Sequence, residues 1–298
     1  MTDLGSPTIA RRRVRLALRE ARETAALTQQ QVADEMEWSL SKVARIENGG
    51  VSIAPNDLRP LLSLVGIVER TRVAALMEDA RVARLRLPAW HQAPGLREHL
   101  TDAFRSLVEY EAEAVAIRYY SIYFIPAVLQ TDAYAKAQIA LLGAESPRAE
   151  IEARLSARKR RREALMSRPD RPRLLALLDE SVLRRPIGGA AVFAAQLRQL
   201  SSLALRGTVE VRMIPFSLDA PVTNNASFDL LSLNTTRENM VLYRESGLAD
   251  ELIEDGPTTL RHRARFDKVW SEAISEKATA DFLNRQAESQ AHPTAPGR

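Results

Sequence analysis

One stretch of this sequence, residues 28–49, restricts the possible folds more than any other. Thr28 is a good helix N-cap, and Gln31 completes a capping box with it. Apolar residues then recur at helical spacing until Ser39 offers a second N-cap, and residues 48–50 end the second apolar run. The stretch therefore predicts two short helices joined by a tight turn. This is the layout of a helix-turn-helix, whose second helix lies in the major groove of DNA.

The same stretch resembles the helix-turn-helix of the XRE family, to which Cro and the phage repressors belong. The residues that carry the resemblance are 27–29, 32–33, 39–45 and 46–49. Two residues depart from the family pattern, because Glu37 and Ala26 stand where the family usually has glycine. A positive φ at Glu37 would strain the turn, since only glycine adopts that conformation at no steric cost.

The resemblance implies which side chains meet double-stranded DNA. We expect the base contacts to come from Ser39, Leu40, Ser41, Lys42 and Arg45. We expect the phosphate contacts to come from Thr28, Gln29 and Asn48. Lys42 or Arg45 would donate to guanine, and Leu40 would touch a thymine methyl group.

The resemblance also implies a structural ion pair between Arg22 and Glu47. This pair would tie the first helix to the recognition helix. Such a partly buried pair fixes geometry more reliably than it adds stability.

The composition is that of a soluble protein with enough residues for two domains, and it is compatible with a nucleic-acid partner. The chain has 298 residues, of which 45% are apolar and 27% charged, as in soluble globular proteins. The absence of cysteine excludes disulfides, thiol catalysis and cysteine-ligated metals. The net charge of +4 suits a nucleic-acid partner. Since the sequence has neither a signal peptide nor an apolar run long enough for a membrane span, we expect a cytoplasmic protein without membrane contact.

The expected fold class is mainly α with a smaller α+β part. We expect a five-helix XRE/Cro-type DNA-binding domain with a connector helix at residues 1–86, and a linker at residues 87–95. A C-terminal α+β domain with a small sheet follows at residues 96–285, and a disordered tail at 286–298. The expected strands cover residues 119–124, 173–179, 209–214, 227–233 and 239–244, before a last helix from 256 to about 284.

Several phrases of the second half resemble the domain that follows XRE helix-turn-helices in actinobacterial regulators of the WhiJ type. They are residues 109–114, 125–135, 183–189, 196–200, 211–215 and 228–231. Ala127 and Val128 depart from the pattern, which usually has Gly-Leu there. The resemblance implies an antitoxin-like repressor whose C-terminal domain binds a small acidic partner protein.

A basic run at residues 158–162 is the strongest cluster of charge. It is either a solvated helix face or a contact with DNA or an acidic partner. For the second interpretation the partner-binding residues are Arg158, Arg160, Arg161 and Arg162.

We also expect a homodimer, because one recognition helix reads too few base pairs to find a site in a genome.

No group of residues has the spacing of an enzyme or metal site. The four histidines, at positions 91, 99, 262 and 292, form no metal-binding pair. We therefore expect no catalytic residues, no metal and no cofactor. Two alternatives stay open: a regulator that senses a small molecule through the aromatic residues 119–124, and, with less support, an enzyme carried on the C-terminal domain.

Overall fold

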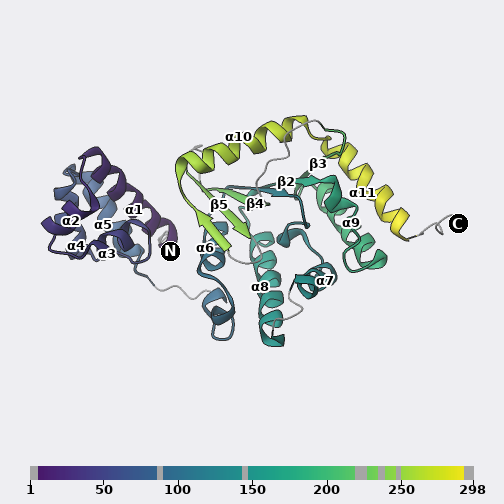
Figure 1. Ribbon diagram of the computed structural model, residues 1–298, viewed down its shortest axis with the longest axis horizontal. Coiled ribbons are helices and arrows are strands. Elements are labelled where there is room, and N and C mark those ends of the chain that lie inside the picture. Colours follow the sequence, from purple (N-terminus) through teal and green to yellow (C-terminus); the bar gives the residue numbers. More distant parts are fainter. Residues whose placement is uncertain are drawn as a thin grey trace. The chain divides into compact units, whose positions relative to one another are not determined.

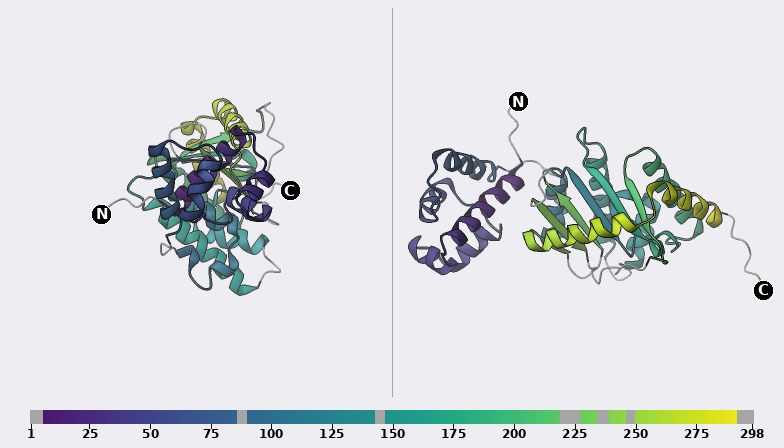
Figure 2. Two further views of the ribbon diagram at one scale, coloured as in Figure 1. Left: turned by 90° about the vertical axis from the view of Figure 1, so that its left-hand side faces the viewer. Right: turned by 90° about the horizontal axis from the view of Figure 1, so that it is seen from above.

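The computed structural model describes residues 6–85, 90–142, 147–218, 227–233, 239–245 and 250–291. The chain divides into two compact units, Met1–Pro88 and Ala89–Arg298 (Figures 1 and 2). The chain is mostly helical, and all of its strands within the described residues belong to the second unit. No helix within the described residues is long and apolar enough to cross a lipid bilayer.

Five α-helices form the described part of the first unit. They are α1 (Pro7–Thr24), α2 (Gln29–Glu35), α3 (Leu40–Glu47), α4 (Pro55–Leu64) and α5 (Arg70–Val82). The capping box at the start of α2 is confirmed: the Gln31 backbone N–H donates to Thr28 Oγ1 at 3.1 Å, and the Thr28 N–H donates to Gln31 Oε1 at 2.8 Å. Ser39 caps α3 by accepting from the Lys42 N–H at 3.2 Å. Both helices thus begin where local hydrogen bonds satisfy their free N–H groups.

The main apolar core of this unit lies between these helices. Its fully buried members include Val14, Leu18, Val32, Ala33, Val43, Ile46, Leu58, Leu62 and Leu76. Ala33 has no exposed surface, and its small side chain lets α2 pack closely against α3. The core therefore fixes the inner side of the helix-turn-helix.

Two turns of this unit hold a residue other than glycine in the left-handed conformation. Ala26 precedes α2 and Glu37 lies between α2 and α3, and both have a φ of 54°. These are the two positions where the sequence departs from the XRE pattern. An L-residue in this conformation costs about 1–2 kcal/mol.

The second unit is built on one six-stranded mixed sheet, larger than the small sheet that the sequence predicted. Its strands are β1 (Ala116–Ser121), β2 (Arg173–Asp179), β3 (Glu210–Ile214), β4 (Phe228–Ser232), β5 (Met240–Glu245) and β6 (Asp250–Ile253). Their spatial order is β3-β2-β1-β4-β5-β6. The first three are parallel, whereas β4, β5 and β6 pair antiparallel.

Helices connect the parallel strands and cover the sheet. They are α6 (Asp102–Glu111), α7 (Asp132–Leu142), α8 (Arg148–Met166), α9 (Ala190–Leu205), α10 (Gly256–Glu272) and α11 (Glu276–Ala291). Short 3₁₀ turns lie at Trp90–Gln92, Arg97–His99, Ala127–Leu129 and Glu180–Leu183. The chain passes through α7 and α8 between β1 and β2, and through α9 between β2 and β3, because parallel neighbours need such crossovers.

The two faces of the sheet carry different helices. On one face Phe266 and Val269 of α10 pack against a cluster that includes Tyr120, Leu177 and Leu242. Figure 1 shows α10 on this side and α6 and α8 on the other. The last helix predicted from the sequence is interrupted, because Ile274 leaves the helical conformation and pairs with β3.

Two predicted boundaries of the second unit are wrong. The tail does not begin at residue 286, since α11 continues to Ala291 and buries Ala287. The linker is shorter than residues 87–95, because Trp90 packs against the second unit and His91 is buried, with Nε2 at 3.1 Å from Glu109 Oε1. The rest of the predicted linker (residues 87–89) and of the tail (292–298) lies outside the described residues.

Replacement of Ala26 by glycine is expected to stabilise the first unit. Glycine removes the left-handed strain but adds chain entropy to the unfolded state, so the net gain is about 0.5–1 kcal/mol. Urea denaturation of the full chain measures this change. The neighbouring residue provides the control: Ala25 is also exposed but has a φ of −74°, so Ala25→Gly should lower the stability. A loss of stability in both variants would contradict the role of the φ angle.

Candidate DNA-binding surface

The outer face of α3 is the exposed part of the helix-turn-helix. Val43 and Ile46 point into the core, whereas Ser41, Arg45 and Asn48 are exposed. Leu40, in the first turn, has 45% of its surface exposed. The face therefore combines an apolar side chain, a hydroxyl, a guanidinium and an amide, which are the groups that read base edges in the major groove.

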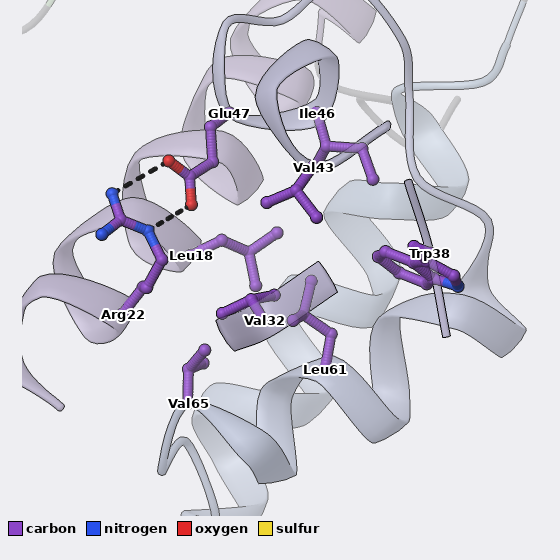
Figure 3. Close-up of a pocket in the computed structure, with 9 residues that line it drawn as sticks. All are labelled: Leu18, Arg22, Val32, Trp38, Val43, Ile46, Glu47, Leu61 and Val65. Carbon is purple, nitrogen blue, oxygen red and sulfur yellow. Dashed lines mark hydrogen bonds and ion pairs between the residues drawn. The ribbon is translucent and has the colours of Figure 1, made fainter. Parts of the chain in front are cut away.

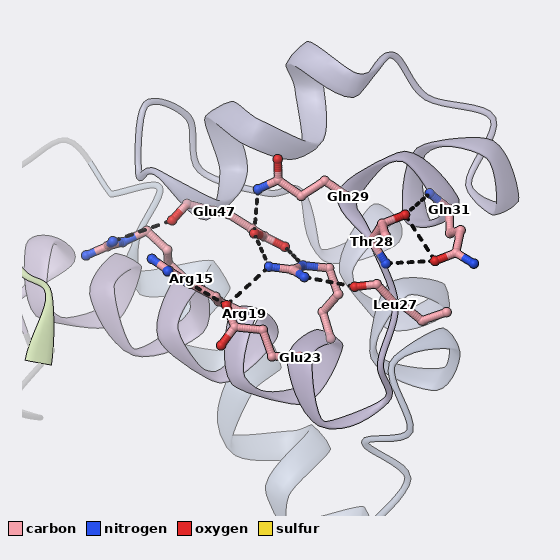
Figure 4. A network of polar contacts seen from close by, with 9 residues as sticks. Arg15, Arg19, Glu23, Leu27, Thr28, Gln29, Gln31 and Glu47 are labelled. Atoms are coloured by element: carbon pink, nitrogen blue, oxygen red, sulfur yellow. Dashed lines mark hydrogen bonds and ion pairs between the residues drawn. The ribbon is translucent and has the colours of Figure 1, made fainter. Parts of the chain in front are cut away.

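On its inner side α3 is held by the carboxylate of Glu47, which is only 5% exposed. Arg22 of α1 donates from Nε to Oε1 at 2.6 Å and from Nη2 to Oε2 at 3.0 Å (Figure 3). Gln29 of α2 donates from Nε2 to Oε2 at 2.7 Å (Figure 4). The group of Arg22, Gln29 and Glu47 contains the Arg22–Glu47 pair that the sequence predicted, with Gln29 as a third member. One carboxylate therefore joins α1, α2 and α3.

The contacts of Arg22 with Glu47 and Leu27 determine how strongly its charge is held. The hydrogen bond to Glu47 raises the pKa of Arg22, although burial opposes the shift. Arg22 also donates from Nη1 to the Leu27 carbonyl at 2.8 Å, just before α2 begins. Removal of one partner from such a buried pair costs about 3–5 kcal/mol, because the other charge is left without compensation.

The ion pair borders a small apolar pocket (Figure 3). Its other lining residues include Leu18, Val32, Trp38 and Val43. The cavity volume is about 10 Å³, which is close to the space that one water molecule needs. This pocket is therefore a gap in the core and not a site for a ligand.

The structure places the three predicted phosphate contacts at helix ends. The capping box occupies both the hydroxyl and the backbone N–H of Thr28, and Glu47 occupies the Gln29 side chain, so the group that the start of α2 offers to a phosphate is the Gln29 backbone N–H. Asn48 is exposed at the end of α3, before Gly49 with its φ of 77°. A helix N-terminus and an exposed amide are both groups that bind phosphate oxygens.

The two predicted cationic base readers differ in their surroundings. Lys42 donates from Nζ to Asp57 Oδ2 at 3.0 Å and lies over the Trp38 ring, 3.7 Å from its centroid. Arg45 is exposed, and its guanidinium makes no hydrogen bond or ion pair with another residue in the described part of the chain. The Arg45 guanidinium therefore offers all of its donors to a ligand, whereas one N–H of Lys42 is already engaged by Asp57.

Comparison with protein families agrees with this division of the chain. A family model described as a helix-turn-helix domain matches residues 14–76. A second model, described as a domain of unknown function (DUF5753), matches residues 104–285, which is more than half of the chain. The chain belongs to the DUF5753 family. The helix-turn-helix domain in front of it indicates a DNA-binding regulator. Neither the curated proteins nor the solved structures contain a match.

In the DUF5753 domain the basic run of α8 is not one exposed surface. Arg161 is buried and donates from Nε and Nη2 to the two carboxylate oxygens of Glu111, both at 2.7 Å, and from Nη2 to Asp229 at 3.2 Å. Arg158 donates to the Gln138 side chain at 2.8 Å. These contacts are internal because α8 turns this side of the run toward the sheet.

Arg162 is likewise engaged within the domain, since it donates to the Gln130 carbonyl and to Asp132, both at 2.7 Å. Of the four predicted partner-binding arginines, only Arg160 is exposed, together with its neighbour Lys159. A continuous partner-binding surface of Arg158, Arg160, Arg161 and Arg162 is therefore incompatible with the packing of α8.

Sequence reasoning missed the carboxylates that meet Arg161. Asp229 lies inside β4, between buried apolar residues. A charged residue within an otherwise apolar strand is the signal that could have identified it. Burial raises the pKa of Asp229 to about 7, against the opposing effect of Arg161, and the neighbouring Glu111 adds to the rise. The two carboxylates also raise the pKa of Arg161, despite its burial.

The aromatic segment at residues 119–124 lies mainly in the core. Tyr119 and Tyr120 are 1% and 2% exposed and point to opposite faces of β1. Tyr120 stacks on Phe228, with the ring centroids 5.2 Å apart. Tyr123 is exposed beyond the end of the strand. These positions favour a packing role over the lining of a shared ligand pocket.

The raised pKa of Asp229 predicts how the stability of this domain depends on pH. The folded protein keeps the proton up to about pH 7, whereas the unfolded chain loses it near pH 4, so the stability falls as the pH rises between these values. Asp229→Asn removes this loss. The stability of the variant relative to the parent should therefore increase by about 2 kcal/mol between pH 5 and pH 8.

Calorimetry of the full chain over this pH range measures the difference. Asp132→Asn is the control, because it removes a carboxylate that is 69% exposed, bonded to Arg162 on the same helix α8. A pH-independent difference between Asp229→Asn and the parent would contradict the prediction.

Proposed function

We propose that this chain is a sequence-specific regulator, a repressor, that places α3 in the major groove of double-stranded DNA. The observation that carries the proposal is the exposed outer face of α3 on a helix whose inner side is fixed by Glu47. A rigidly held helix can present its side chains to base edges without first paying to order them. Helix-turn-helix proteins use the N-terminal part of the second helix in this way.

The proposed base contacts follow from the exposed groups. Arg45 donates to O6 and N7 of guanine, the commonest specific contact in the major groove. Leu40 meets a thymine methyl group, and Ser39, Ser41 and Lys42 contact neighbouring base edges. The backbone N–H group of Gln29 at the start of α2, together with Asn48, holds phosphates and sets the register of the protein on the duplex.

We further propose that two copies of the chain bind one operator. The eight residues of α3 reach only a few base pairs. Two-fold symmetry would place two half-sites about 10 base pairs apart, or a multiple of that distance. A measured mass of one chain per operator would rule out this arrangement.

The DUF5753 domain is proposed to act as a protein-binding module that controls DNA binding, as in antitoxin-like regulators. The resemblance to WhiJ-type regulators implies an acidic partner, and Lys159 and Arg160, the two exposed cations of the basic run 158–162, offer it a positive surface. Opposite charges on two surfaces accelerate their association. Coupling between the two activities is reciprocal, so operator DNA must change the affinity for the partner as much as the partner changes the affinity for DNA.

Replacement of Arg45 by alanine should cost about 1–3 kcal/mol of specific binding and relax the preference at one base position. The loss is specific because a guanidinium that bonds to guanine does not fit the other bases. Titrations of the full chain with single-base operator variants measure it. Arg81→Ala is the matched control: it removes an exposed arginine from α5, where Arg81 pairs with Glu78, and should leave the base preference unchanged. An unaltered preference in Arg45→Ala would exclude Arg45 as a reader.

Reversal of charge at Lys159 and Arg160 should slow the association with the partner at least severalfold and reduce its salt dependence. The probe is the small acidic protein that the proposal expects a neighbouring gene to encode. Glutamates at both positions should leave operator binding by the same chain unchanged. Normal association of the reversed protein would show that these residues are a solvated helix face.

A further inference from the structure

Three elements of the first unit meet at the ammonium group of Lys42. The residue belongs to the first turn of α3, Trp38 comes from the turn before it, and Asp57 comes from the first turn of α4. The Nζ atom lies 3.0 Å from Asp57 Oδ2 and 3.7 Å from the centroid of the Trp38 ring. The side chains of Lys42 and Asp57 are 39% and 41% exposed, so the pair is part of the surface.

This arrangement changes what Lys42 offers to DNA. A free lysine is a mobile point charge that attracts any phosphate, and it has no directional preference of its own. Beside Asp57 the net charge of the pair is zero, so the long-range attraction to phosphate is largely cancelled. The ammonium still has three N–H donors, of which Asp57 accepts one, and the Trp38 ring limits its motion.

We propose that Asp57 is a specificity-determining residue of the DNA-binding surface. It neutralises and orients Lys42, so that the remaining N–H donors serve base-edge acceptors and not phosphates. The inference rests on the proposed DNA-binding function and deepens it, because it assigns a role to a carboxylate that makes no favourable contact with DNA itself.

The physical reason is the different nature of the two acceptors. Base edges such as guanine O6 and N7 are neutral and need a placed donor, which the pair still supplies. Phosphate binding depends on net charge and on the release of counterions, which the pair does not provide. Asp57 therefore weakens binding to all DNA alike, while the correct operator recovers the loss through directed hydrogen bonds.

The test is Asp57→Asn in the full chain. The probes are a duplex selected by the parent protein from a random pool and a scrambled duplex of the same length and composition. With the carboxylate removed, Lys42 can reach a phosphate, which adds about one unit to the slope of log affinity against log salt. Binding to the scrambled duplex should tighten about fivefold at 0.15 M salt. The ratio of operator to scrambled affinity should fall severalfold.

Two comparisons isolate the effect. Glu78→Gln removes another surface carboxylate that is paired with a cation, Arg81 of α5, and it should change the affinity for both duplexes by the same small factor. In a Lys42→Met background, Asp57→Asn should no longer change the affinity ratio, because the side chain that it restrains is absent. Asp57→Ser gives the same readouts should the asparagine variant melt at a lower temperature than the parent.

The outcomes separate the inference from the function on which it rests. If the parent protein selects no duplex from the pool, the proposed DNA-binding function is wrong and the role of Asp57 falls with it. If the parent discriminates between the duplexes but Asp57→Asn keeps both the affinity ratio and the salt slope, only the role of Asp57 is overturned.

Discussion

The buried carboxylate of Glu47 is the group on which the geometry of the first unit depends. A carboxylate at this depth is tolerated only when its oxygens are fully bonded, and here Arg22 and Gln29 supply the bonds from two other helices. The position of α3 is therefore set by α1 and α2 together. Loss of a partner costs about 3–5 kcal/mol, which is a large part of the 5–15 kcal/mol that stabilises a typical domain. The exposed face of α3 owes its fixed position to a contact on its hidden face.

In the DUF5753 domain a buried cation, and not a buried carboxylate, joins three elements of the fold. Arg161 is buried on α8, and its guanidinium bonds to Glu111 of α6 and Asp229 of β4. Three elements that lie far apart in the sequence thereby meet at one ion. Burial raises the pKa of Asp229 to about 7 against the opposing effect of Arg161, and the second carboxylate, Glu111, adds to the rise. In both units, one buried ion specifies how the elements around it are placed.

What the sequence predicts correctly is local. The two caps and the apolar spacing place α2 and α3, and an unbroken apolar run places β2 at residues 173–179. What it misses depends on distant partners. Strand β6 is short and starts with Asp250 and Glu251, so only its pairing with β5 identifies it. The basic run of α8 has the pattern of a solvated face, because its carboxylate partners lie 50 and 68 positions away from Arg161. Asp57, the partner of Lys42, could not be predicted from the sequence either, because it lies 15 positions away on another helix.

The arginines of α1 show why placement matters more than total charge in this protein. Arg12 and Arg15 are buried, Arg13 lies 3.4 Å from Asp79, and Arg19 pairs with Glu23 at 3.0 Å. A helix that reads as strongly basic thus has most of its charge committed within the unit. An attraction for DNA that comes from net charge alone is correspondingly weak, and it carries no sequence information. Discrimination must then come from the few groups that face outward on α3, where the Arg45 guanidinium has no hydrogen-bond partner among the described residues and Lys42 is held by Asp57.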